Sequence, residues 1–173
     1  MKKNWKTLLV CILIPLTVGI VAGLLTMGGM EQFARLEKPA LAPPAWLFPI
    51  VWTILYILMG ISSYLIYTGE CLNGIFKVMF QDGKNRACTP EQKNRALTLY
   101  GYQLLVNFLW PVFFFNFEWY GFSYLWLILL WILVAAMIWE FDKISQTAAL
   151  LNVPYIIWLS IAGYLNLSIW ILN

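Results

Sequence analysis

Charged residues in this chain gather into a few short clusters, and the stretches between them are long and apolar. Five windows carry no charged residue: Thr7–Met30, Pro39–Gly69, Ala96–Phe117, Trp119–Trp139 and Ile144–Asn173. Each window is at least as long as the roughly 20 residues that a helix needs to cross a hydrocarbon core. Because backbone polar groups find no water in lipid, segments that cross it must be helices. The sequence therefore predicts an all-α fold, an integral membrane bundle of five transmembrane helices.

These windows leave little of the chain outside a lipid bilayer. Only 11% of the residues are charged while 62% are hydrophobic, too few charges to cover the core of a soluble domain. No internal repeat is visible, so we expect one membrane domain over residues 1–173. Its expected helices are about 7–30, 46–67, 90–117, 122–141 and 152–172, with a first loop at 31–45 and a long second loop at 68–89. The fourth helix is apolar all round, so we expect it to face lipid more than ligand.

The N-terminal window raises the alternative of a cleaved signal peptide, because it follows Lys2, Lys3 and Lys6. Its apolar stretch is much longer than the about 7–15 residues of a signal sequence. The small residues in "GIVAGLLTMGG" leave cleavage open, but we expect a retained helix.

Lys and Arg are unequally divided between the two sides of such a bundle. Three segments share one side: the N-terminal tail, the second loop counted through Arg95, and the fourth loop, which hold three, five and one basic residues. The other side has only Arg35 and Lys38. Because loops rich in Lys and Arg stay in the cytoplasm, the N-terminus is expected to be cytoplasmic. This asymmetry also accounts for the net charge of +3, so we expect no nucleic-acid partner.

Residues that commonly hold metals or move protons are scarce. The chain has no histidine, which is the commonest metal ligand, a frequent general base and the usual axial ligand of haem iron. Its cysteines are Cys11, Cys71 and Cys88, and the last two, in a loop expected in reducing cytoplasm, are expected to be free thiols. We expect no metal site and no required cofactor.

Aromatic and amide side chains within the expected helices fall into stripes with helical spacing. The stripes are Trp52, Tyr56 and Gly60; Gln103, Asn107, Trp110 and Phe114; and Trp158, Ala162, Leu165 and Ile169, flanked by Asn166. Hydrogen bonding between helices is the ordinary role of amides in a bilayer. Three such stripes also suit a large planar ligand, which needs rings to stack on and a few polar contacts. We expect a pocket among the first, second, third and fifth helices, with room left by Gly60, Ala162 and Gly163.

Prolines mark both the expected lid and one helix start. "KPALAPP" stiffens the first loop, and long ordered loops often act as lids. The expected lid residues are Pro39, Pro43, Pro44 and Trp46. In "TPEQ", Thr89 as N-cap, followed by Pro90 and Gln92, predicts a helix that begins with a capping box.

Three segments, "KPALAPPAWLFPIVWTILYILMG", "NFLWPVFFF" and "VPYIIWLSIAGYLNLSIWILN", resemble the TspO/MBR family of translocator proteins. The resemblance covers about Lys38 to Asn173, apart from the second loop. It implies a five-helix membrane protein that binds tetrapyrroles such as protoporphyrin IX, binds benzodiazepine-site drugs and often forms a homodimer. Because the chain lacks histidine, we expect a metal-free tetrapyrrole, although Cys, Met or Tyr could still bind iron. For some bacterial members it also implies light-dependent porphyrin breakdown that needs two pocket tryptophans.

By this resemblance, the two tryptophans that would be catalytic are Trp52 in "VWTILY" and Trp158 in "PYIIW". The family's drug-site tryptophan matches Trp110, and a small residue that affects ligand binding matches Ala162. One departure is Leu41, where the family usually has tryptophan, so the lid has one ring fewer.

The function expected from these features is binding of porphyrin by a protein of a bacterial cell membrane. The protein would sense or sequester the porphyrin, or promote its breakdown in light, with Tyr56, Gln103 and Asn107 able to bond its polar edge. An alternative is a transporter of porphyrin or another amphiphile, although transporters commonly show internal repeats that this chain lacks. Enzymatic turnover is left open, because the expected helices contain no acid–base constellation.

Overall fold

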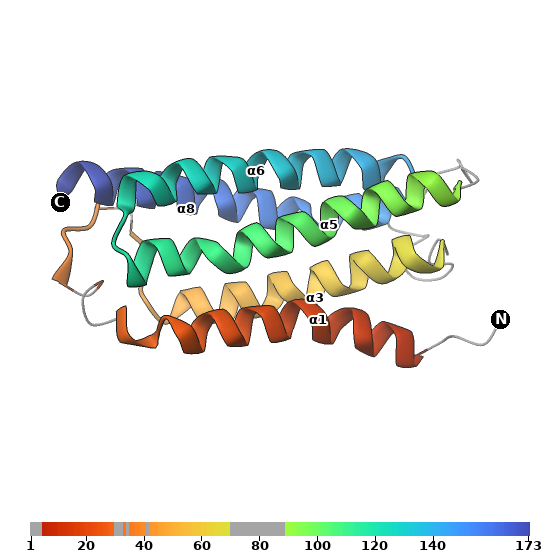
Figure 1. The fold of residues 1–173 in the computed structure, drawn as a ribbon, viewed down its shortest axis with the longest axis horizontal. Coiled ribbons are helices and arrows are strands. Elements are labelled where there is room, and N and C mark those ends of the chain that lie inside the picture. The colour runs from red at the N-terminus through yellow and green to blue at the C-terminus, as the bar shows by residue number, and fades with distance from the viewer. Residues whose placement is uncertain (1–4, 30–32, 34, 41, 70–88) are drawn as a thin grey trace.

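The computed structural model describes residues 5–29, 33, 35–40, 42–69 and 89–173, which form a bundle of long helices (Figure 1). The elements are α1 (Trp5–Leu25), η1 (Met27–Gly29), α3 (Leu47–Thr68), α5 (Pro90–Pro111), η2 (Val112–Asn116), α6 (Tyr120–Asp142), α7 (Gln146–Leu150) and α8 (Val153–Leu172). Five helical stretches are long and apolar enough to cross a membrane, and the described residues contain no strand. The expected all-α membrane bundle is thus confirmed. Met30, Leu41, Cys71 and Cys88 lie outside the described residues, as does nearly all of the second loop.

The first helix ends earlier than the expected residue 30. α1 stops at Leu25, where Thr26 donates its hydroxyl to Ala22 O at 2.9 Å, and a short 3-10 turn follows. Gly28 and Gly29 lie in this turn, and glycine is a poor helix former. The length of the charge-free window therefore overestimated the length of this helix by several residues at its C-terminal end.

The third membrane helix, which consists of α5 and η2, changes from α-helical to π-helical winding near its C-terminal end. Pro111 has no N–H for the α-helical ladder, and residues Val112–Asn116 continue as a π-helix, closed by Phe117 N–H donating to Val112 O at 3.1 Å. At its start, the helix has the expected capping box. Gln92 N–H donates to Thr89 Oγ1 at 3.2 Å, and Thr89 N–H donates to Gln92 Oε1 at 3.3 Å.

Helix α6 packs one of its faces against other helices and leaves the rest exposed. It packs against both α5 and α8, and one face is buried along its length, including Leu130, Val134 and Met137. Its composition is apolar all round, which hides from sequence inspection the side that contacts protein. The expectation that this helix faces lipid more than ligand stays a prediction, because its buried face meets helices α5 and α8.

Helices α1 and α3 lie side by side, and they touch through their backbones at Gly60. A Cβ added to Gly60 would lie 2.5 Å from Ile12 Cα and 2.8 Å from Cys11 O. Gly163 similarly faces α6, where its Cβ would be 3.3 Å from Leu127 Cδ2. The expectation that these two glycines leave room for a ligand is therefore wrong, because they allow helices to pack closely.

Candidate ligand site beneath the first loop

The polar stripe of α5 meets α3 and α8 in a buried hydrogen-bond network. Tyr56 donates its hydroxyl to Asn107 Oδ1 at 2.8 Å, and Asn107 Nδ2 donates to Tyr155 Oη at 2.9 Å. Tyr155 in turn donates to Gln103 Oε1 at 3.1 Å. All four side chains are buried, so each bond replaces water that the interior excludes. The network fixes the positions of three helices and sets polar groups in an otherwise apolar interior.

Tyr155 is the central residue of this network, and sequence inspection missed it. Its side chain is completely buried, and its hydroxyl both accepts and donates a bond. Tyr155 precedes Trp158 by three residues and Ala162 by seven, so helical spacing places it on the same stripe. Extending the stripe by one turn toward the N-terminus of the helix would have found it.

Trp52 and Trp158 lie in a layer of rings between α3 and α8. Trp52 stacks on Tyr56 with ring centroids 5.5 Å apart and meets Tyr155 edge-on at 6.0 Å. Trp158 meets Phe48 edge-on at 5.5 Å. Trp158 Nε1 is buried and has no hydrogen-bond partner among the described residues. A buried donor without an acceptor is unfavourable, so this N–H is available to an acceptor group on a ligand.

The remaining expected site residues continue this interior toward the first loop. Trp110 stacks on Phe114 at 5.2 Å. In the orientation that satisfies both ends of its amide, Asn166 donates to Tyr120 O at 2.8 Å and accepts from Trp110 Nε1 at 3.3 Å. Ala162 and Leu165 are buried on the same helix. The structure thus brings the expected residues of α5 and α8 to facing sides of one interior.

A small cavity of about 40 Å³ lies directly under the first loop. Pro39 and Pro43, both expected in the lid, line it together with Phe48, Leu165 and Ile169. Pro44 and Trp46 do not line it, and Trp46 is 65% exposed at the start of α3.

The described part of the loop is held in place at two points. The Phe33 ring lies 5.7 Å from Phe115, and Lys38 Nζ lies 4.5 Å above the Phe33 ring. On the other side, Glu37 N–H donates to Asn173 Oδ1 at 3.0 Å, and Asn173 Nδ2 donates to Glu37 O at 3.1 Å. The Asn173 amide therefore binds the loop backbone as a neighbouring peptide would.

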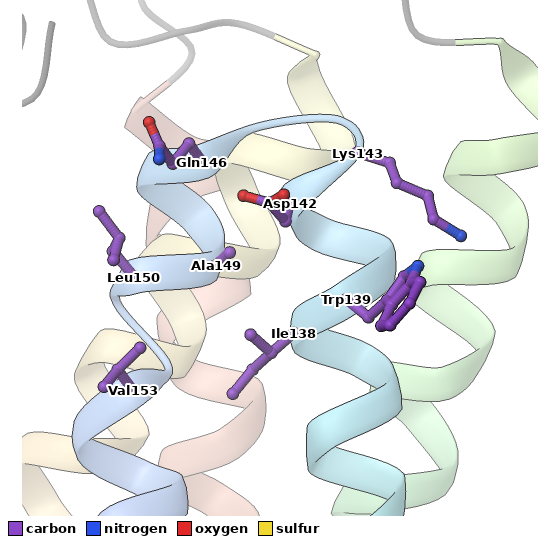
Figure 2. A pocket seen from close by; sticks show the side chains of 8 residues that line it. All are labelled: Ile138, Trp139, Asp142, Lys143, Gln146, Ala149, Leu150 and Val153. Carbon is purple, nitrogen blue, oxygen red and sulfur yellow. The ribbon is translucent and has the colours of Figure 1, made fainter. Parts of the chain in front are cut away.

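The site is closed in this structure. Pockets for small molecules are typically about 300–1,000 Å³, far more than the cavity under the loop offers. A large ligand must displace the loop and reorient rings such as Phe48 and Trp158. The larger groove of about 500 Å³ lies elsewhere, between α6 and the α7–α8 region (Figure 2).

These features define an integral membrane protein with five helices and an aromatic interior that carries amides and phenols. The family model described as "TspO/MBR family" matches residues 11–171. The chain belongs to the TspO/MBR family.

Relatives from bacteria and mammals agree with this assignment. "Tryptophan-rich protein TspO" of Chlorobaculum tepidum is 34% identical, with 100% of this chain and 99% of that protein covered. "Protein CrtK" of Rhodobacter capsulatus is 36% identical over 82% of this chain and 78% of its own. "Translocator protein" of Bos taurus is 34% identical over 91% of this chain and 85% of its own. The chain thus matches most of the length of each of these relatives.

Proposed function

We propose that this chain binds a metal-free tetrapyrrole, such as protoporphyrin IX, among α3, α5 and α8 beneath the first loop. The observation that supports this most is the meeting of Trp52, Trp158 and a buried network of amides and phenols in one interior layer. Broad rings offer stacking surface to a planar macrocycle, and the polar groups orient its edge. The unpartnered Trp158 Nε1 suits an acceptor such as a propionate oxygen.

A metal-free ring fits the chemistry of this interior better than haem does. The sequence contains no histidine, the usual axial ligand of haem iron, although Cys, Met or Tyr could still bind iron. Amide and phenol groups can bond pyrrole nitrogens and carboxylates without a metal. The proposed actions on the bound ring are sensing, sequestration or light-dependent breakdown, and a homodimer is a further part of the proposal. Hydrophobic drug-like molecules of the benzodiazepine-site type are proposed to share the site.

Binding tests the proposal directly. Purified protein is titrated with protoporphyrin IX in the dark, and quenching of tryptophan fluorescence is followed. Saturable quenching at one porphyrin per chain is expected. Quenching that rises linearly without saturation would show only partition into detergent and would end the proposal.

Replacing Trp110 with alanine is expected to weaken porphyrin binding by about 1 kcal/mol, since one aromatic stack is lost. Because Trp110 also stacks on Phe114 and meets Phe115 edge-on, the Tm of the variant is measured beside its affinity to separate lost ligand contact from lost packing. Dissociation constants from the same titration measure the effect. A suitable control is Trp5→Ala, because Trp5 is 64% exposed at the far end of α1. Equal weakening by both substitutions would contradict the position of the site.

Trp126 is unsuitable as that control, although α6 was expected to face lipid. Its Nε1 donates to Val106 O at 2.9 Å, and its ring meets Phe113 edge-on at 5.0 Å. Removing it would disturb the contact between α5 and α6. A loss of binding in Trp126→Ala would therefore not distinguish ligand contact from packing.

We also propose that the chain lies in a bacterial cell membrane with its N-terminus in the cytoplasm. The relatives from Chlorobaculum tepidum and Rhodobacter capsulatus support a bacterial setting, and the unequal distribution of Lys and Arg supports the orientation. Cys71 and Cys88 are then expected to resist a membrane-impermeant thiol reagent in intact cells and to react after lysis. Strong labelling before lysis would show that the proposed orientation is wrong.

A further inference from the structure

A groove of about 500 Å³ opens between α6 and the α7–α8 region (Figure 2). It lies where α6 ends and α8 begins, at the opposite end of the bundle from the first loop and Asn173. None of the residues of the proposed porphyrin site lines it. The groove therefore needs its own explanation.

The walls of the groove are apolar and stand at the end of two membrane-spanning helices. Ile138 on α6 points toward Ala149 and Val153 across the groove, and Leu150 lies at its outer edge (Figure 2). Trp139, 68% exposed, stands at the edge, as tryptophans do at the level of lipid headgroups. Such walls suit the first carbons of an acyl chain.

The mouth of the groove carries polar groups with balanced charge. Asp142 and Gln146 lie together near the connection from α6 to α7 (Figure 2). Lys143 lies on the other side, 2.8 Å from Glu140, and Arg95 binds the same carboxylate through 2.9 Å contacts. Two positive and two negative side chains thus cancel around the mouth, and of these four only Asp142 and Lys143 line the groove.

Asp142 differs from Glu140 because it makes no ion pair with any described residue. Its carboxylate and the Gln146 side-chain oxygen are both hydrogen-bond acceptors at one end of the groove. Lys143 is already paired with Glu140, so a ligand head that places a primary ammonium there would pair Asp142, the groove-lining charge that no described residue pairs.

We propose that this groove binds a phospholipid with an ethanolamine headgroup. Its ammonium donates to Asp142 and Gln146, its phosphate lies at the mouth between the ammonium and the apolar walls, and its acyl chain follows Ile138, Leu150 and Val153. A choline head has no N–H to donate, and a glycerol head would leave Asp142 unpaired beside an anion. The inference is independent of porphyrin binding.

The test is native mass spectrometry of the full chain with an equimolar mixture of phosphatidylethanolamine, phosphatidylcholine and phosphatidylglycerol with identical acyl chains. The wild type is expected to retain ethanolamine lipid in preference to the other two. Asp142→Asn is expected to reduce that preference by roughly twofold to fivefold, the size expected for one exposed ion pair. Because Asp142 is exposed, the substitution leaves the packing of α6 intact.

The matched control is Glu91→Gln, which removes an exposed carboxylate from the first turn of α5, outside the groove, and should leave the preference unchanged. Leu150→Trp narrows the groove and should lower retention of all three lipids. Equal retention of the three lipids by wild type, or an unchanged preference in Asp142→Asn, would overturn the proposal. So would loss of a dimer in Leu150→Trp with lipid retention unaltered, because a second copy would then cover the groove.

Discussion

Light-driven loss of bound protoporphyrin is expected to stop when either Trp52 or Trp158 is replaced by phenylalanine, while binding in the dark largely survives. A phenyl ring keeps most of the stacking surface that each indole offers within the ring layer. Phenylalanine is much harder to oxidise, so it cannot give an electron to the excited porphyrin, which the indole would reduce by one electron. The porphyrin absorption band is followed under a lamp, with dark affinity measured separately.

One control and two contrary outcomes of this experiment distinguish the possible roles of the two tryptophans. Trp5→Phe is the control and should bleach porphyrin like the wild type, because Trp5 lies outside the site. If Trp52→Phe and Trp158→Phe also bleach at the wild-type rate, the two tryptophans are only walls of the site. If the wild type protects porphyrin from light, the protein is a binder or sensor, and breakdown is the wrong function.

A valine at Gly60 is expected to destabilise the bundle by about 3 kcal/mol, at the upper end of the usual cost of overpacking. Its Cβ would lie 2.5 Å from Ile12 Cα and 2.8 Å from Cys11 O. Both atoms belong to the backbone of α1, so no side chain can rotate away and the helix itself must shift. Thermal unfolding in detergent, followed by circular dichroism, should show a clear fall in Tm.

Gly23→Val is the matched control for this prediction, because a Cβ on Gly23 meets no heavy atom of the described residues within 4 Å. Gly23 lies on α1, so this substitution adds the same side chain to the pair α1 and α3 without crowding the contact between them. A Gly60→Val protein as stable as Gly23→Val would mean that α1 and α3 do not approach at this point.

The sequence by itself determined those features whose causes are local. Charge-free windows predicted five membrane helices because an unpaired charge in lipid is costly wherever the helix packs. The capping box at Thr89 follows from the chemistry of four successive residues. Helical spacing placed Gln103 and Asn107 on one face, and both are buried.

Only the tertiary structure decided what those faces meet. Sequence inspection placed Gly60 in the ligand pocket together with the rest of its stripe on α3. In the structure Gly60 packs against α1, whereas Tyr56 bonds to Asn107. It also missed α7, which is joined to α3 because Ser62 donates to Ala148 O at 2.7 Å and Asn152 donates to Ser62 Oγ at 2.6 Å.

The closed state of the first loop likewise depends on contacts between distant residues. Glu37 and Asn173 are 136 positions apart, and neither carries a local pattern that predicts their pair of hydrogen bonds. Tyr155 became the centre of the polar network because α3 and α5 bring Tyr56, Gln103 and Asn107 to its hydroxyl side. Periodicity determines which residues share a face of one helix, whereas the partner of that face depends on how separate helices pack.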